Sequence, residues 1–374
     1  MSNRKILSLL TPLVCWVHLG AQSGSDSSRH TLSLLAATDV YYAAFNTDLP
    51  ASGLAPYNTV GPRDNTFGLN VAQIGLSYTG PNTRANFTYQ IGDIPLAAWS
   101  PEFPNVQAAN AGFRVASDWW VDAGFFSTHI GYESFLPRQK YLSSAAFISF
   151  NEPFFQAGLR AAGPLTERLS AQVWLLNGYN TFVETNAAKS VGVRLSYQIS
   201  ETANITYNNL LGGEGPDDGA SQFRQTHNLF ASNTFADRLT VILNATYVYQ
   251  TNTGNPASDG ASVGGGFLTI DYALTDRFNA TVRGEYFTDE AGFISGRVPA
   301  VQFNVDDGLT GVDLIALATS LQYRPAANAY VRAETRLTRQ GADMRLFTRD
   351  GARLDDRVEF LLTAGVSFGR EVRW

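Results

Sequence analysis

The chain has 374 residues and a formal net charge of −6, and only 16% of its residues are Asp, Glu, Lys or Arg, whereas globular domains average about 25%. Its three lysines, Lys5, Lys140 and Lys189, and a pI near 5.3 leave no basic surface for binding nucleic acid. Mean hydropathy is −0.11, so the chain is poor in charge without being strongly apolar.

The first residues have the pattern of an export signal. Arg4 and Lys5 supply positive charge, and residues 6–19 form an apolar stretch that is too short for a membrane-spanning helix of about 20 residues. We expect residues 1–21 to be a cleaved signal peptide and residues 22–374 to be one domain. The single cysteine lies in the signal, so disulfides cannot stabilise that domain.

Apolar residues in the rest of the chain recur at every second position. Phe278, Val282 and Tyr286 fall on one face of an extended segment, while Arg283 and Glu285 fall on the other. A helix would separate these charges by turns instead of alternating them. The same alternation recurs in residues 239–250, 329–337 and 360–374. It predicts an all-β fold, a transmembrane antiparallel β-barrel with an apolar outer face.

Short polar turns alternate with long loops rich in Gly, Asp and Pro. Seven short turns are predicted at residues 80–82, 117–118, 164–168, 199–202, 236–238, 275–277 and 325–328. Between them lie about eight longer loops, which implies about 16 strands with short periplasmic turns, long external loops and both termini periplasmic. We treat residues 144–163 as a loop followed by a strand, because Pro153 would interrupt a central strand.

The end of the chain carries an assembly pattern. Phe368 and Trp374 continue the apolar face of the last strand, and Trp374 is the final residue. This resembles the terminal signal that the barrel assembly machinery reads in bacterial outer-membrane proteins. The competing interpretation is an edge strand of a soluble sandwich.

A longer stretch resembles a known family. Residues 121–134 read VDAGFFSTHIGYES, and residues 149–178 read SFNEPFFQAGLRAAGPLTERLSAQVWLLNG. They resemble the OmpL-like β-barrel porin-2 family in Gly131, Glu133, Pro153, Phe154, Gly158, Asn177 and Gly178. Gln156 departs from the pattern, where a residue such as His is expected. The resemblance implies an outer-membrane porin.

A barrel of this size would enclose a water-filled lumen lined by the polar face of its strands. We predict the pore-lining residues Arg84, Arg160, Arg194, Asp271, Arg283, Glu285, Arg332, Glu334 and Arg336. Residues 132–150, rich in aromatic and small side chains, are predicted to fold inward as a constriction. The charges spaced two apart on one strand could instead form ion pairs that brace the wall.

The function expected is passive diffusion of small hydrophilic solutes or ions across an outer membrane, without catalysis, cofactor or metal. The chain would contact outer-membrane lipids and could assemble as a homotrimer. One alternative is a plugged barrel that serves as a surface adhesin or structural anchor. Another is a barrel-type lipid hydrolase using Ser127 and His129, for which no Gly-x-Ser-x-Gly elbow is present.

Two further groups of residues are candidate sites. The loop acids Glu214, Asp217, Asp218, Asp306 and Asp307 could offer oxygen ligands to calcium, but they lack the spacing of a calcium loop, and we expect solvated external loops. His227 alternates with Leu229, which favours a place in the pore wall or in a loop.

Overall fold

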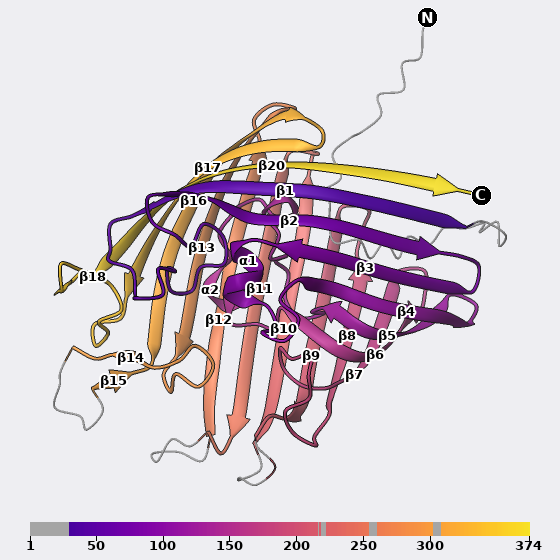
Figure 1. Cartoon of the computed structure of the whole chain (residues 1–374), viewed down its shortest axis with the longest axis horizontal. Helices are drawn as coiled ribbons and strands as arrows, with labels where there is room; N and C mark the ends of the chain where they lie inside the picture. Colours follow the sequence, from indigo (N-terminus) through magenta and orange to yellow (C-terminus); the bar gives the residue numbers. More distant parts are fainter. Residues whose placement is uncertain (1–29, 216, 218–221, 254–259, 302–307) are drawn as a thin grey trace, which may run out of the picture.

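Sixteen strands form one closed antiparallel barrel (Figure 1), which confirms the predicted fold class and strand number. The computed structural model describes residues 30–215, 217, 222–253, 260–301 and 308–374, so the predicted signal peptide lies outside the described residues. The barrel strands are β1 (Thr31–Phe45), β2 (Thr66–Thr79), β3 (Thr83–Ile91), β4 (Val106–Ala116), β5 (Trp119–Ser127), β6 (Phe155–Pro164), β7 (Leu169–Leu176), β8 (Ser190–Gln198), β9 (Ala203–Gly213), β10 (Phe223–Phe235), β11 (Leu239–Thr251), β12 (Gly260–Ala273), β13 (Phe278–Asp289), β16 (Val312–Ala326), β17 (Ala329–Gln340) and β20 (Asp356–Arg373).

The remaining elements are short and lie in the loops. They are α1 (Asp93–Ala98), the 3₁₀ turn η1 (Pro137–Gln139), α2 (Phe147–Phe150), and two small hairpins, β14 (Val298–Pro299) with β15 (Leu309–Thr310) and β18 (Thr348–Arg349) with β19 (Ala352–Arg353). In the described parts of the chain, no helix is long and apolar enough to cross a membrane.

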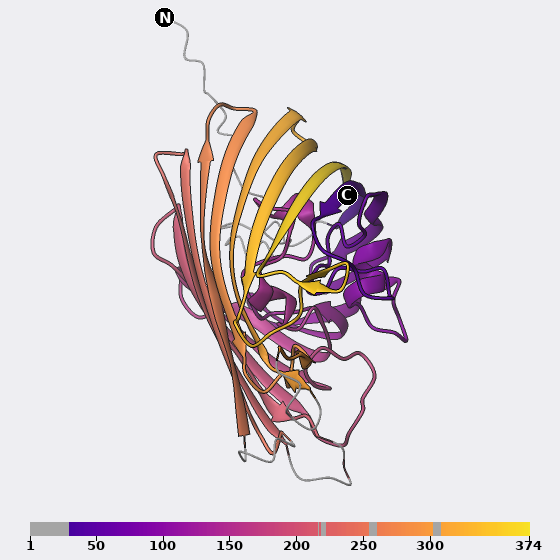
Figure 2. The same cartoon turned by 90° about the vertical axis from the view of Figure 1, so that its left-hand side faces the viewer.

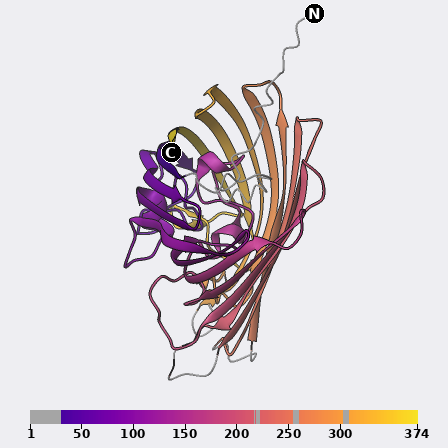
Figure 3. The same cartoon turned by 90° about the vertical axis from the view of Figure 1, so that its right-hand side faces the viewer.

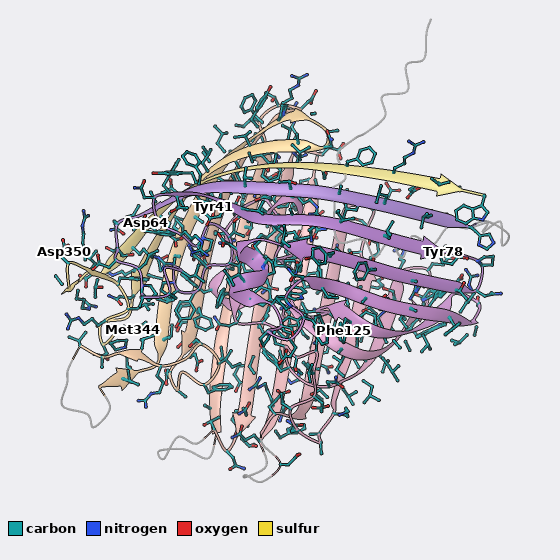
Figure 4. All side chains as sticks on the ribbon, in the orientation of Figure 1. Tyr41, Asp64, Tyr78, Phe125, Met344 and Asp350 are labelled. Carbon is teal, nitrogen blue, oxygen red and sulfur yellow. The ribbon has the colours of Figure 1, made fainter. Side chains whose placement is uncertain are left out.

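The two rims of the barrel differ as predicted. Seven short turns join successive strands at one rim, where β1 begins and β20 ends, and eight longer loops occupy the other (Figure 1). Figure 4 places Tyr78 at the rim of short turns and Asp350 at the rim of long loops. We call these rims the turn end and the loop end.

Alternation along the strands separates an apolar outer face from a polar inner face. On β13, Val282 and Tyr286 are 45% and 48% exposed, whereas Arg283 and Glu285 are buried. Such an outer band matches the apolar surface that a barrel presents to lipid. The sequence predicts His227 in the pore wall or in a loop, but the structure places it on the outer face of β10 beside Leu229. There its ring forms a hydrogen bond of 2.7 Å with the hydroxyl of Tyr207.

The first and last strands close the barrel. β1 pairs with β20 along its whole length, from Thr31 opposite Arg373 to Phe45 opposite Glu359. Beyond this ladder, His30 and Trp374 exchange backbone hydrogen bonds of 2.9 and 3.1 Å, and their rings stack with centroids 5.6 Å apart. Closure leaves no strand edge with unpaired N–H and C=O groups, which a bilayer interior would not tolerate.

The strands differ in length around the barrel. Figures 2 and 3 show the long strands β9–β13 on one side and the strands near the N-terminus on the opposite side, with loop segments and short helices between them. β3 and β5–β8 have 8 to 10 residues each, against 11 to 14 in β9–β13. The loop segments between β3 and β8 therefore start deeper in the barrel.

Gly158 of the family-like stretch occupies a position that requires glycine. Its φ is +153°, and a Cβ there would lie 2.0 Å from the backbone oxygen of Leu175 on β7. Gly158 also pairs directly with Gly124 of β5, whose φ is +130°. Any side chain here would be strained and would push β6 away from β7.

We predict that Gly158→Val lowers the folded fraction of the barrel, because left-handed strain alone costs about 1–3 kcal/mol. The fraction is measured as the heat-modifiable band on unboiled gels after refolding into detergent. The matched control is Gly284→Val, since a Cβ at Gly284 meets nothing within 4 Å. Equal folding of the two variants would contradict the role given to Gly158.

Candidate functional site

The candidate site is the lumen together with the third loop (residues 128–154), which joins β5 to β6. Alternation and contacts place all nine predicted pore-lining side chains on the inner side of the wall: Arg84, Arg160, Arg194, Asp271, Arg283, Glu285, Arg332, Glu334 and Arg336. Their surroundings divide them into two groups, one covered by the third loop and one at the turn end.

The third loop folds into the barrel, as predicted for residues 132–150, and α2 forms within it. It reaches β20 through Ser143, whose hydroxyl lies 2.7 Å from that of Thr363. It reaches β10 through Tyr132, whose ring packs edge-on against Phe230 with centroids 5.3 Å apart. Further bonds join the loop to Gln73 of β2, Asn209 of β9, Thr246 of β11, Glu285 of β13, Ser320 of β16 and Glu334 of β17. The loop thus spans the lumen.

Ionic contacts fix the loop to β13. Arg283 is 0% exposed, and its Nη1 donates to Glu133 of the loop at 2.8 Å and to the backbone oxygen of Ser144 at 3.0 Å. Its Nη2 donates to Glu285 at 3.2 Å. Glu285 in turn accepts the backbone N–H of Phe147 at 2.7 Å. Each charge at this contact therefore has a partner of opposite sign or a hydrogen bond, as buried charges require.

One acidic and one basic side chain of β17 form hydrogen bonds with the third loop. Glu334 accepts the backbone N–H groups of Ser143 at 2.6 Å and Ser144 at 3.3 Å. Arg332 donates to the backbone oxygen of Lys140 at 2.7 Å and to the Ser143 hydroxyl at 2.9 Å. Hydrogen bonds to ionised groups are stronger than neutral ones, so this contact holds the loop firmly.

Arg336 completes the cluster and links it to β20 and to the first loop (residues 46–65). Its Nη1 donates to the backbone oxygen of Ala145 at 3.0 Å, and its Nε bonds Glu359. Glu359 also pairs with Arg357 at 2.8 Å and accepts the side-chain amide of Asn58 at 2.8 Å. Arg357, Glu359 and Asn58 were not predicted from the sequence; alternation alone would have placed the first two on the inner face of β20.

Burial bears on the two interpretations of the charges spaced two apart, as pore-lining groups or as ion pairs that brace the wall. Arg283, Arg332 and Arg336 are at most 1% exposed, and Glu285 and Glu334 are also buried. None of the five borders open solvent, so the interpretation of these charges as a brace fits the structure. These charges hold the third loop in place against the wall.

Apolar packing supports the same arrangement. Phe147 and Ile148 of the loop belong to a buried cluster with Ile242, Phe267 and Phe287 of the barrel wall. Ile242 interrupts the polar side of its strand in the sequence. The cluster explains this, because the inward apolar side chain packs against the third loop and is not exposed to water.

Burial and neighbouring charges shift the pKa values of Glu133, Lys140 and Glu152 in the third loop. Burial alone would raise the pKa of Glu133, but Arg283 and Lys140 outweigh burial and hold it below its ordinary value. Burial lowers the pKa of Lys140 to about 8 and raises that of Glu152 to about 8. Glu152 accepts a hydrogen bond from the hydroxyl of Thr246.

The other predicted residues lie toward the turn end. Arg84 and Arg160 both bond Asp122 of β5, and side-chain exposures of 26% and 14% leave them accessible. Arg194 donates to the backbone oxygen of His129 at 3.2 Å. Asp271 is buried and accepts hydrogen bonds from Thr281 and Asn279 of β13 at 2.7 and 2.8 Å.

Ser127 and His129 do not form a catalytic pair. β5 ends at Ser127, so the alternation that would place both on one face stops before His129. Nδ1 of His129 lies 2.8 Å from Gln156 and Nε2 lies 2.8 Å from the backbone oxygen of Asn209, so both ring nitrogens are occupied. No hydrogen bond joins Ser127 to His129 among the described residues.

The loop acids are bonded to the protein itself. Glu214 accepts the backbone N–H of Tyr179 at 2.9 Å, and Asp217 accepts that of Ala187 at 2.9 Å. Asp218, Asp306 and Asp307 lie outside the described residues. Within the described ranges, no group of three or more His, Cys, Asp or Glu residues is placed to hold a metal ion.

Comparisons with known proteins agree with this architecture. Residues 32–368 match the family model described as "Putative beta-barrel porin-2, OmpL-like". No curated protein matches the sequence. Similar solved structures include an anion-selective porin from Comamonas acidovorans (TM-score 0.58, 10% identity, covering 91% of this chain and 100% of that chain). The outer-membrane channel DcaP of Acinetobacter baumannii is also similar (TM-score 0.58, 11% identity, covering 92% of this chain and 99% of that chain). A trimer form of OmpT from Vibrio cholerae is similar to the same degree (TM-score 0.58, 10% identity, covering 91% of this chain and 99% of that chain).

We predict that Arg283→Met lowers the free energy of unfolding by about 3–5 kcal/mol, because it leaves buried Glu133 and Glu285 without their shared partner. Unfolding is followed in urea in lipid vesicles. We also expect trypsin to cut the loosened loop after Arg138. The matched control is Arg373→Met, whose pair with Glu371 is exposed and should contribute at most about 1 kcal/mol. Equal losses in the two variants would contradict the brace.

Proposed function

Because the chain belongs to the OmpL-like β-barrel porin-2 family, we propose that it is an outer-membrane porin through which small hydrophilic solutes or ions diffuse passively. The observation that carries this proposal is the closed barrel of 16 strands, with an apolar outer face and a lumen lined by charged and polar groups. Passive diffusion needs no cofactor and no catalytic group, which makes the protein a channel and not an enzyme.

We propose that the third loop limits the passage of solutes, because it spans the lumen. Between the loop and the wall, the cavity bordered by Tyr132, Lys140 and Phe267 has a volume of about 20 Å³, and that bordered by Asn58 and Arg336 has about 10 Å³. A single water needs about 10–15 Å³ measured in this way, so these gaps admit water and not a solute. We propose that solutes pass when the loop shifts from its brace.

The same packing favours a second candidate, a permanently plugged barrel that acts as a surface adhesin or structural anchor. In that case the loop would stay in place, and the external loops would carry the function. The two candidates differ in one measurable property, since only the porin conducts ions.

The route to the membrane follows from the ends of the chain. We propose that residues 1–21 direct export and are removed, and that the barrel assembly machinery recognises Phe368 and Trp374. Both side chains are on the outer face, 52% and 60% exposed, where a partner could reach them. Lipids of the outer membrane would then surround the apolar band.

We further propose that the barrel assembles as a homotrimer. The support is the trimer form recorded for the structurally similar Vibrio cholerae protein. Light scattering of the detergent-solubilised protein tests this, and a monomeric mass would refute it.

In planar bilayers, we expect the purified protein to give stepwise ion conductance. A protein that folds and inserts but never conducts would support the plugged anchor instead.

We predict that Ser143→Cys with Thr363→Cys closes the channel in its oxidised form, because the two wild-type hydroxyl oxygens lie 2.7 Å apart, within the reach of a disulfide. Conductance should fall to the baseline on oxidation and return on reduction. Each single cysteine variant serves as the control. Unchanged conductance in the cross-linked protein would mean that solutes pass beside a fixed loop.

A further inference from the structure

Three arginines and one aspartate from neighbouring strands lie together toward the turn end of the lumen. Nε of Arg84 on β3 donates to Asp122 of β5 at 2.5 Å, and Nη2 of Arg160 on β6 donates to it at 2.9 Å. Arg114 of β4 lies beside them, because the strand register pairs it with Trp120, two residues before Asp122. Four adjacent strands therefore bring these groups into one patch.

Aromatic rings support the guanidinium groups. Arg84 and Arg114 both stack on Trp120, at 4.5 and 5.0 Å from the ring centroid. Arg160 lies over Trp174 of β7 at 5.3 Å. Stacking is favourable for a cation and covers its flat face, so the edges that carry the N–H groups remain the part able to bind a ligand.

The patch holds more hydrogen-bond donors than the protein uses. Arg84 and Arg160 each direct Nε and Nη2 to Asp122, which leaves Nη1 of each without a partner among the described residues. Arg114 makes no side-chain hydrogen bond or ion pair there, and its Nε is buried without a partner. Unused donors of this kind are costly unless a ligand or water satisfies them.

The charge is likewise unbalanced. The patch carries three positive charges and one negative charge, a net charge of +2. A structural brace would need only the two arginines that hold Asp122, and Arg114 adds nothing to that contact. In the brace that holds the third loop, by comparison, Arg283, Arg336 and Arg357 face Glu133, Glu285 and Glu359.

The patch is also accessible. Side-chain exposures of Arg84 and Arg160 are 26% and 14%, against 0% for Arg283. Gly112 of β4 keeps the surface open, because a Cβ there would lie 2.2 Å from Asp122 Oδ1. A solute in the turn end of the lumen can therefore reach the guanidinium edges.

We propose that Arg84, Arg114 and Arg160 bind the carboxylate of small organic acids and make such acids preferred solutes of the channel. A planar guanidinium presents two parallel N–H groups that match the two oxygens of a carboxylate. The apolar surface of Trp120 and Trp174 beside them suits an acid with an aromatic or other apolar body. The preference for transport rests on the proposed porin function, whereas binding itself does not.

Binding is tested with Arg114→Gln, since this substitution leaves both partners of Asp122 in place. Sodium benzoate is titrated into the folded, detergent-solubilised protein and followed by calorimetry. We expect the affinity for benzoate to fall about tenfold or more, the effect of losing a hydrogen bond between charged groups. Sodium chloride is the competing probe, and chloride binding as tight as benzoate binding would overturn the carboxylate site.

Two variants distinguish binding by the guanidinium groups from the general effect of positive charge in the lumen. Arg114→Lys keeps the charge but loses the planar fork, so we expect benzoate affinity to fall while the reversal potential in a potassium chloride gradient stays near that of the wild type. Arg324→Gln removes a positive charge from β16 at the same end of the barrel and should leave benzoate affinity unchanged. Equal benzoate binding by the wild type, Arg114→Gln and Arg114→Lys, each verified as folded by heat modification, would overturn the proposal.

Transport is read separately in bilayers. We expect the benzoate-over-potassium permeability ratio of Arg114→Gln to fall about two- to fivefold, as for loss of one charge in a wet lumen. A wild-type protein that binds benzoate but does not conduct would refute the porin function and leave the site standing. A protein that conducts but does not bind benzoate would refute the site alone.

Discussion

Closure of β1 onto β20 is the constraint on which the rest of the molecule depends. Inside a bilayer, each unpaired backbone group costs several kcal/mol, so a sheet can cross only when its two edges meet. Here the edges meet along all of β1, and the ladder ends in the backbone exchange between His30 and Trp374. Closure with 16 strands creates an interior too wide for wall side chains alone to fill.

The third loop fills much of that interior, and its chemistry follows from where it lies. A segment without regular structure has N–H and C=O groups that need partners, and an interior covered from water offers them only from the wall. Glu334 supplies acceptors to Ser143 and Ser144, and Arg332 supplies donors to Lys140. Charged residues are thus placed on the inner face because they can satisfy the backbone of the loop as well as one another.

The sequence predicts the wall well and its partners poorly, for a physical reason. Strand number, turn positions and the inner face follow from a period of two, which is a local property of the chain. The partner of Arg283 lies 150 residues away in the loop, and nothing periodic links Glu133 to it. Two signs of this contact are visible in the sequence: the aromatic and small side chains of residues 132–150, and Ile242, because an apolar residue on a polar face requires an apolar neighbour inside the barrel.

His129 and Gln156 show the same limit on a smaller scale. Gln156 departs from the expected family pattern, yet its side chain bonds His129 at 2.8 Å, and His129 stacks on Trp174 at 5.0 Å. A serine and a histidine two apart predict a shared face only while the strand continues. Once β5 ends at Ser127, the loop's own packing decides where the imidazole lies.

The two groups of luminal arginines are best understood by what opposes their charge. In the cluster that holds the third loop, carboxylates and loop carbonyls surround each guanidinium, because a buried cation without partners would destabilise the fold. Toward the turn end, Asp122 pairs with Arg84 and Arg160, Arg114 has no ion pair among the described residues, and water can supply what the protein does not. Buried arginines opposed by several carboxylates and loop carbonyls hold structure in place, whereas exposed arginines opposed by a single carboxylate retain donors for a ligand that arrives from solution. This difference in pairing, not the presence of arginine on the inner face, separates residues that support the lumen from residues that can select what enters it.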